Sequence, residues 1–97
     1  MPGARRYLDY NAAAPLRPEA AAAMRSALEV CGNPSSVHGE GRAARRIVED
    51  ARAAVAGLVD AAPADVVFVS GGTEANALAL AQAEQAFVSA GEHDSVA

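Results

Sequence analysis

The sequence predicts an α/β fold in which helices cover a mainly parallel sheet. Residues 66–69 are all β-branched or aromatic, without an intervening polar residue, which is the pattern of a strand buried on both faces. Gly71 and Gly72 end this run, and an Ala/Leu-rich stretch without Gly or Pro covers residues 75–90. A strand, a glycine turn and a helix in this order form the unit around which the rest of the chain is organised.

Two helices are predicted before this unit, and residues 7–9 give only a weak strand signal. Proline is tolerated in a first helical turn and an acidic side chain suits the positive end of the helix dipole, so Pro18 and Glu19 predict a helix over 18–30. Apolar residues at spacings of three and four predict a second helix over 40–59. The Gly-, Pro-, Asn- and Ser-rich segment between them is predicted to be irregular, and its spacing favours a polar connector and a functional loop about equally.

The predicted final helix covers residues 75–90, although Phe87-Val88-Ser89 could already leave it for a second parallel strand. Gly91 would then end that strand, and His93 would lie at its carboxyl end beside the glycine turn. Ligands gather at that edge of an open α/β sheet. A lone histidine is nevertheless more often an ordinary surface or core residue.

The glycine turn has the features of a phosphate-binding site. A helix N-terminus carries unpaired N–H groups and the positive end of the dipole, glycines allow close approach of a ligand, and Thr73 adds a hydroxyl. The alternative is an ordinary strand-to-helix turn capped by Thr73, and spacing alone favours that alternative. The chain lacks the Gly-Lys-Ser/Thr of a Walker A loop and the Gly-x-Gly-x-x-Gly of a dinucleotide fold.

Composition narrows the function classes. The net charge of −4 argues against nucleic acid, and all eight cationic side chains are arginines, so the chain contains no lysine. Cys31 is the only cysteine, which excludes an internal disulfide and a multi-cysteine metal site, and its place at a helix exit makes it a poor nucleophile. Neither a signal peptide nor a membrane-spanning run is evident, so we expect a soluble cytoplasmic protein without a membrane or metal partner.

Four segments of the chain fit one family together, in order and at compatible spacing: residues 7–12, 32–38, 67–76 and 92–96. They resemble the NifS/IscS-type cysteine desulfurases, which belong to the class V aminotransferase group of pyridoxal-phosphate (PLP) enzymes. The resemblance extends over essentially the whole chain, and it makes phosphate binding the favoured interpretation of the glycine turn.

The resemblance implies a homodimeric, fold-type I transferase with a three-layer α/β/α architecture and PLP as cofactor. Such an enzyme removes sulfur from L-cysteine, giving L-alanine and an enzyme persulfide that supplies an iron–sulfur scaffold protein for cluster assembly. By matching position, Gly72 and Thr73 would hold the cofactor phosphate. His93 would stack on the pyridine ring and assist proton transfers, and Asn11 and residues 32–38 would lie near the active site.

Several family features are missing from these residues. Ala13 and Ala14 stand where the family usually has two threonines, and Ala77 replaces a common second asparagine. The Schiff-base lysine, the acid that pairs with the pyridine nitrogen, the arginine that binds the substrate carboxylate and the mobile-loop cysteine have no counterpart, and Cys31 does not match that cysteine. The 97 residues alone are therefore not expected to be active.

The missing features lead us to expect an N-terminal fragment of a desulfurase. Residues 1–15 would belong to the small domain, and residues 16–97 would begin a truncated large PLP-binding domain. One alternative is a selenocysteine lyase or another enzyme of the class V aminotransferase fold. A second alternative, from a different class, is a non-catalytic phosphate-binding or interaction module.

Overall fold

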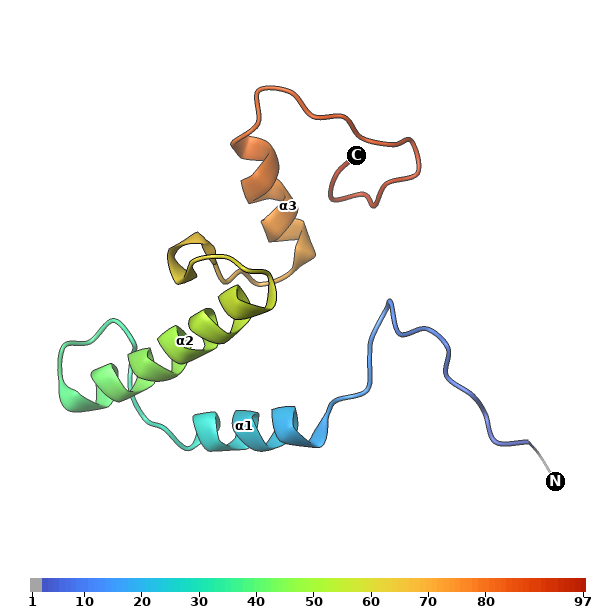
Figure 1. Ribbon diagram of the computed structural model, residues 1–97. Coiled ribbons are helices and arrows are strands. Elements are labelled where there is room, and N and C mark those ends of the chain that lie inside the picture. Colours follow the sequence, from blue (N-terminus) through green and yellow to red (C-terminus); the bar gives the residue numbers. More distant parts are fainter. Residues whose placement is uncertain (1–2) are drawn as a thin grey trace. The chain divides into compact units, whose positions relative to one another are not determined.

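The computed structural model describes residues 3–97, and its regular structure there is helical (Figure 1). The elements are α1 (Pro18–Leu28), α2 (Gly39–Leu58), the short 3₁₀ helix η1 (Pro63–Asp65) and α3 (Gly72–Ala81). The chain forms two compact units, a first that ends at Asp50 and a second from Ala51 to Ala97. The glycine turn and His93 both belong to the second unit, so that unit carries the candidate site.

The predictions for the first two helices are confirmed to within two residues at each end. Arg17 is the extended N-cap of α1, Pro18 follows it in the first turn, and Glu19 places an acidic group at the positive end of the dipole. Helix α2 is amphipathic, as its apolar spacing indicated. Local signals of this kind act within one or two turns and do not require the rest of a fold.

The segment between α1 and α2 is irregular, as predicted, and two glycines let it lie against the first turn of α2. Gly32 has a φ of 154°, a region that side chains disfavour, and a Cβ there would meet the Glu40 carbonyl. A Cβ on Gly41 would lie only 2.7 Å from the Asn33 carbonyl oxygen. The loop and the helix therefore approach each other as closely as backbone atoms allow.

The predicted sheet is not confirmed, because no strand is present between residues 3 and 97. Residues 66–69 and 7–9 have no strand partner in this part of the chain. The expectation of burial on both faces also fails, since Val67 is 68% exposed and Phe68 is 48% exposed. A strand is stabilised by hydrogen bonds to its neighbours, and a single strong strand segment cannot supply them.

The prediction of a helix over 75–90 was too long, because α3 ends at Ala81. The Gln82 and Ala83 N–H groups donate to the carbonyls of Ala79 and Leu80, which tightens the last turn. Helix propensity is a weak force without a packed face, and α3 has no buried residue. Residues 87–89 form no strand either, and Phe87 is fully exposed.

Little apolar surface is buried in the described part of the chain. Its buried hydrophobic residues are Ala44 (9% exposed) and Ala56 (1% exposed), both in α2. Large apolar side chains, among them Leu58 and Val59, are exposed by more than half. No helix between residues 3 and 97 is long and apolar enough to cross a membrane.

Candidate functional site

The N-terminus of α3 forms directly behind the two glycines. Gly71 is the extended N-cap, with φ 171°, and Gly72 and Thr73 are the first two residues of the helix. The Ala75 N–H donates to the Gly71 carbonyl at 3.1 Å, so the N–H groups of residues 72–74 precede the first N–H that has an intrahelical acceptor. Apart from chain neighbours and the backbone of α3 itself, no described atom lies within 4 Å of a Cβ placed on Gly71 or Gly72. The turn therefore presents three N–H donors and the exposed Thr73 to open space.

A carboxylate closes the turn on the side of Ser70. One oxygen of Glu74 accepts hydrogen bonds from the Ser70 hydroxyl at 2.6 Å and from the Ser70 N–H at 2.9 Å. The hydroxyl first, and then the backbone N–H, lower the pKa of Glu74 below its usual range. These contacts use the donors of Ser70 and fix the entry into α3, and they do not involve the N–H groups of residues 72–74.

Arg52 of α2 holds the segment that leads into the turn. Its guanidinium donates to the Val66 carbonyl and lies 5.0 Å from the ring centroid of Phe68. A planar guanidinium can make both contacts at once, whereas an ammonium group makes a point contact. The extended segment before Ser70 is therefore attached to α2 instead of to a neighbouring strand.

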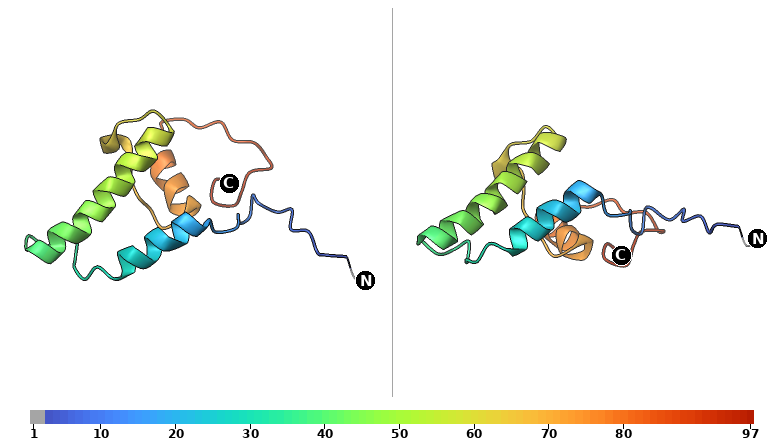
Figure 2. Two further views of the ribbon diagram at one scale, coloured as in Figure 1. Left: turned by 60° about the horizontal axis from the view of Figure 1, so that its bottom comes forward. Right: turned by 90° about the horizontal axis from the view of Figure 1, so that it is seen from below.

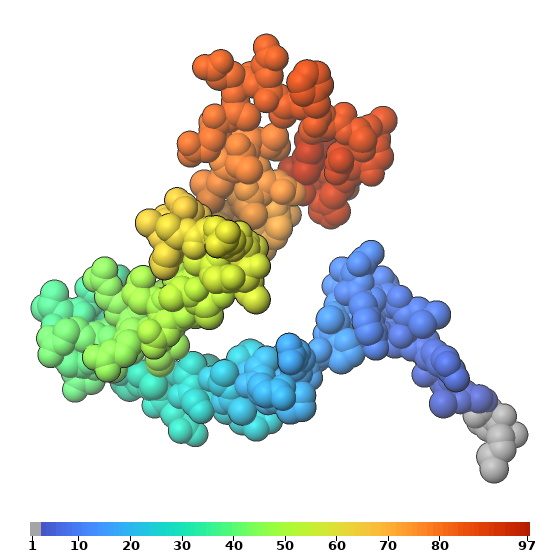
Figure 3. All heavy atoms as spheres, viewed as in Figure 1, coloured from blue at the N-terminus to red at the C-terminus, as the bar shows by residue number. Residues whose placement is uncertain are grey.

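His93 lies in the C-terminal segment and is connected to α3 through Ser95. The Asn76 amide donates to the Ser95 hydroxyl at 2.8 Å, and that hydroxyl lies 2.9 Å from His93 Nδ1. Figures 1 and 2 show the C-terminal segment beside α3 from three directions, and Figure 3 shows its atoms (red) against those of α3 (orange). His93 is thus brought to the first two turns of α3, although by a hydrogen-bonded turn and not at a strand end.

The second unit also has an open apolar pocket of about 470 Å³ between the extended segment and α3. Neither Gly72, Thr73 nor His93 lines it. An apolar lining without converging donors does not suit a phosphate, so the helix N-terminus and not this pocket is the candidate anion site. The lining residues are Asp65, Val67, Val69, Ala75, Leu78, Ala79 and Gln82.

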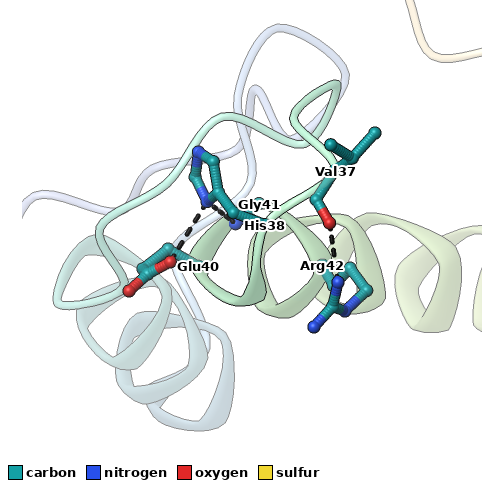
Figure 4. A network of polar contacts seen from close by, with 5 residues as sticks. All are labelled: Val37, His38, Glu40, Gly41 and Arg42. Atoms are coloured by element: carbon teal, nitrogen blue, oxygen red, sulfur yellow. Dashed lines mark hydrogen bonds and ion pairs between the residues drawn. The ribbon is translucent and has the colours of Figure 1, made fainter.

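His38, the imidazole of the loop at 32–38, serves in the first unit as the cap of α2 (Figure 4). Its Nδ1 lies 3.3 Å from the Gly41 N–H, which donates to it, and 3.1 Å from a carboxylate oxygen of Glu40. The Arg42 side chain donates to the Val37 carbonyl at 2.6 Å and fastens the loop to the same turn. These contacts support the interpretation of the loop as a structural connector.

The glycine turn was predictable from the sequence, whereas the contacts of the side chains that support it were not predicted. Ser70 and Glu74 stand four residues apart across the turn, and this spacing could have indicated the hydrogen bonds between them. The contact between Asn76 and Ser95 spans 19 residues, and no local pattern predicts it. In residues 3–97 no group of three or more His, Cys, Asp or Glu side chains is arranged to hold a metal.

Comparison with known proteins identifies the family. The family model for Aminotransferase class-V matches residues 6–96. A selenocysteine lyase of Rattus norvegicus is 45% identical over 80 residues, covering 81% of this chain and 18% of that protein. An IscS-like cysteine desulfurase of Mycobacterium tuberculosis is 45% identical over 74 residues, covering 76% of this chain and 19% of that protein. A cysteine desulfurase of Cereibacter sphaeroides is 51% identical over 79 residues, covering 79% and 20%.

The chain spans about a fifth of the length of these curated relatives. No solved structure matches it significantly. The resemblance to the cysteine desulfurases is confirmed, and relatives named selenocysteine lyase match equally well. The chain belongs to the class V aminotransferase family, a group of PLP-dependent enzymes of fold type I.

Proposed function

We propose that this chain supplies the cofactor-phosphate site of a PLP-dependent cysteine desulfurase. The observation that carries the proposal is the open N-terminus of α3, where three N–H donors precede the first intrahelical hydrogen bond. Gly72 and Thr73 would bind the phosphate through their N–H groups, and the Thr73 hydroxyl would add a donor. The donor set fits a phosphate, since helix N-termini favour anions and the glycines leave the approach free of side chains.

His93 is the second residue that we assign to the site. Its ring is linked to Asn76 of α3 through Ser95, so it stays close to the helix that would hold the phosphate. Bound PLP supplies an electron-poor ring that stabilises negative charge on the substrate. We propose that His93 stacks on that ring and exchanges protons with the reacting groups, for which an imidazole is suited near neutral pH.

The overall reaction would convert L-cysteine and an enzyme thiol into L-alanine and an enzyme persulfide. The persulfide sulfur would pass to a scaffold protein that assembles iron–sulfur clusters. A second candidate is the release of selenium from L-selenocysteine, which is favoured by the relatives that carry the name selenocysteine lyase. The two candidates differ in their substrate. The rates at which the natural protein that carries these residues converts L-cysteine and L-selenocysteine to alanine would decide between them.

The residues present here would act within a larger protein. The chain has no lysine to bond the cofactor, and neither Cys31 nor another residue matches the family's reactive cysteine. We propose that residues 1–15 belong to the small domain and residues 16–97 to the large domain of a cytoplasmic homodimer. In that protein residues 66–69 would gain neighbouring strands and join the sheet of the family fold.

Binding of pyridoxine 5′-phosphate tests the proposal on this chain. This probe carries the phosphate and the ring but no aldehyde, so it cannot bond to an amine. We expect Thr73→Ala to weaken binding by roughly tenfold, the effect of removing one hydrogen bond to a charged group. Thr73→Ser keeps the hydroxyl and should bind like the parent. Equal affinity of the parent and Thr73→Ala would contradict the assignment of Thr73.

A further inference from the structure

The hydrogen bonds around Ser95 have a defined direction. The Ser95 backbone N–H lies 3.1 Å from His93 Nδ1 and can only donate, so Nδ1 accepts and carries no proton. The Ser95 hydroxyl, 2.9 Å from the same nitrogen, must then donate as well. In the neutral ring the single proton therefore resides on Nε2.

Asn76 determines which way the Ser95 hydroxyl points. Its amide nitrogen has no lone pair to offer and donates to the Ser95 oxygen at 2.8 Å. The hydroxyl accepts on that side, which leaves its own proton for His93. Asn76 and Ser95 are partly buried, so this arrangement is partly shielded from competing water.

We propose that Asn76 and Ser95 are positioning residues for His93, which hold its neutral ring in the Nε2–H tautomer and leave Nε2 as the nitrogen available to a bound group. Second partners commonly fix a functional histidine in this way, because the nitrogen that is hydrogen-bonded determines the state of the other. The inference rests on the proposed function only for the identity of that group. The tautomer itself is a property of residues 76, 93 and 95.

The tautomer can be measured on this chain without a cofactor. Long-range ¹H–¹⁵N correlation spectra of the ¹⁵N-labelled protein, recorded where histidine is neutral, separate protonated from unprotonated ring nitrogens. The sequence has two histidines, so His38 serves as an internal reference. We expect His93 of the parent protein to show a protonated Nε2 and an unprotonated Nδ1.

Two substitutions should shift the tautomer ratio of His93, meaning the population with the proton on Nδ1 relative to the population with the proton on Nε2. Asn76→Asp puts a carboxylate where the amide stood, so the Ser95 hydroxyl donates to it and no longer to His93. Ser95→Ala removes the hydroxyl but keeps the backbone donor. We expect the Nδ1–H population of His93 to rise by roughly threefold in Asn76→Asp and by less in Ser95→Ala, within the range produced by loss of one hydrogen bond.

Controls separate this effect from general unfolding. Ser95→Thr keeps the hydroxyl and should retain the parent ratio, and Ser89→Ala removes a hydroxyl that donates to Glu92. The His38 ratio should not change in any variant. An unchanged His93 ratio in both Asn76→Asp and Ser95→Ala, or a parent protein with the proton on Nδ1, would overturn the inference. A shifted ratio in a chain that fails to bind pyridoxine 5′-phosphate would refute the proposed function and leave the positioning role intact.

Discussion

Gly41 should be the most sensitive glycine of α2, because it is where the preceding loop touches the helix. A Cβ at this position would lie 2.7 Å from both the Asn33 carbonyl oxygen and the Ser36 Cβ, and it would come closest to the Ser36 carbonyl. Backbone atoms cannot rotate out of the way, so the loop must move when Gly41→Ala is made. The Ser36 N–H to Asn33 carbonyl hydrogen bond, 2.9 Å long, lies in the part that must move.

The size of this effect follows from two opposing contributions. Overpacking costs about 1–3 kcal/mol, whereas replacing glycine by alanine inside a helix gains about 1 kcal/mol. Gly57 lies in the same helix, and a Cβ added there would have no described atom within 4 Å beyond its chain neighbours and the helix's own backbone, so Gly57→Ala brings the gain without the clash. Subtracting one variant from the other removes most of the propensity contribution. The free energies of unfolding should differ by about 1–3 kcal/mol, with Gly41→Ala the less stable.

Urea unfolding followed by circular dichroism at the helical band measures both variants under the same conditions. Amide hydrogen exchange at Ser36 provides a local readout, and protection there should fall in Gly41→Ala only. Equal free energies of unfolding of the two variants would show that the loop does not lie against α2 in this way.

Two further predictions concern the turn itself. Replacing Arg52 by Ala should remove the contacts to Val66 and Phe68 and destabilise the extended segment before Ser70 by about 1–2 kcal/mol, which should appear as faster amide exchange after residue 66. Arg52→Lys should recover only part of the lost protection, because an ammonium group makes a point contact. Unchanged amide exchange in Arg52→Ala would refute the attachment of this segment to α2. The pKa of Glu74 is lowered in the folded chain, so its stabilising effect is present above the usual carboxyl range and is lost as the pH falls through the lowered value. Acid titration of helicity should show this loss in the parent but not in Glu74→Gln. Identical titrations of the two proteins would contradict the hydrogen bonds from Ser70 to the Glu74 carboxylate.

The elements that the sequence predicted well are those with local causes. Helix α1 begins at Pro18 beside Glu19, and α2 has its apolar residues at helical spacing, so each could be placed without knowledge of its neighbours. Helix α3 begins at Gly72, three residues before the predicted start at residue 75, and this start has a local cause too, since the two glycines end the preceding segment and Glu74 suits a first turn.

The features that the sequence predicted badly depend on partners. The apolar run at 66–69 has strand composition, but pairing needs other strands, and between residues 3 and 97 there are none. The predicted extension of α3 to residue 90 relied on Ala and Leu propensity, which does not suffice without a packed face. The link from Asn76 to His93 runs through Ser95. Asn76 lies 19 residues before Ser95 in the sequence, so only the structure could reveal this hydrogen bond.

Locating the phosphate group of a bound probe is the most direct test of the proposed function. Amide ¹H–¹⁵N spectra of the chain, recorded during titration with pyridoxine 5′-phosphate and in parallel with pyridoxine, report which N–H groups bind the phosphate. We expect saturable shifts of the Gly72, Thr73 and Glu74 amides with the phosphorylated probe and none with pyridoxine. Shifts confined to other residues, or equal responses to both probes, would contradict a phosphate site at the start of α3.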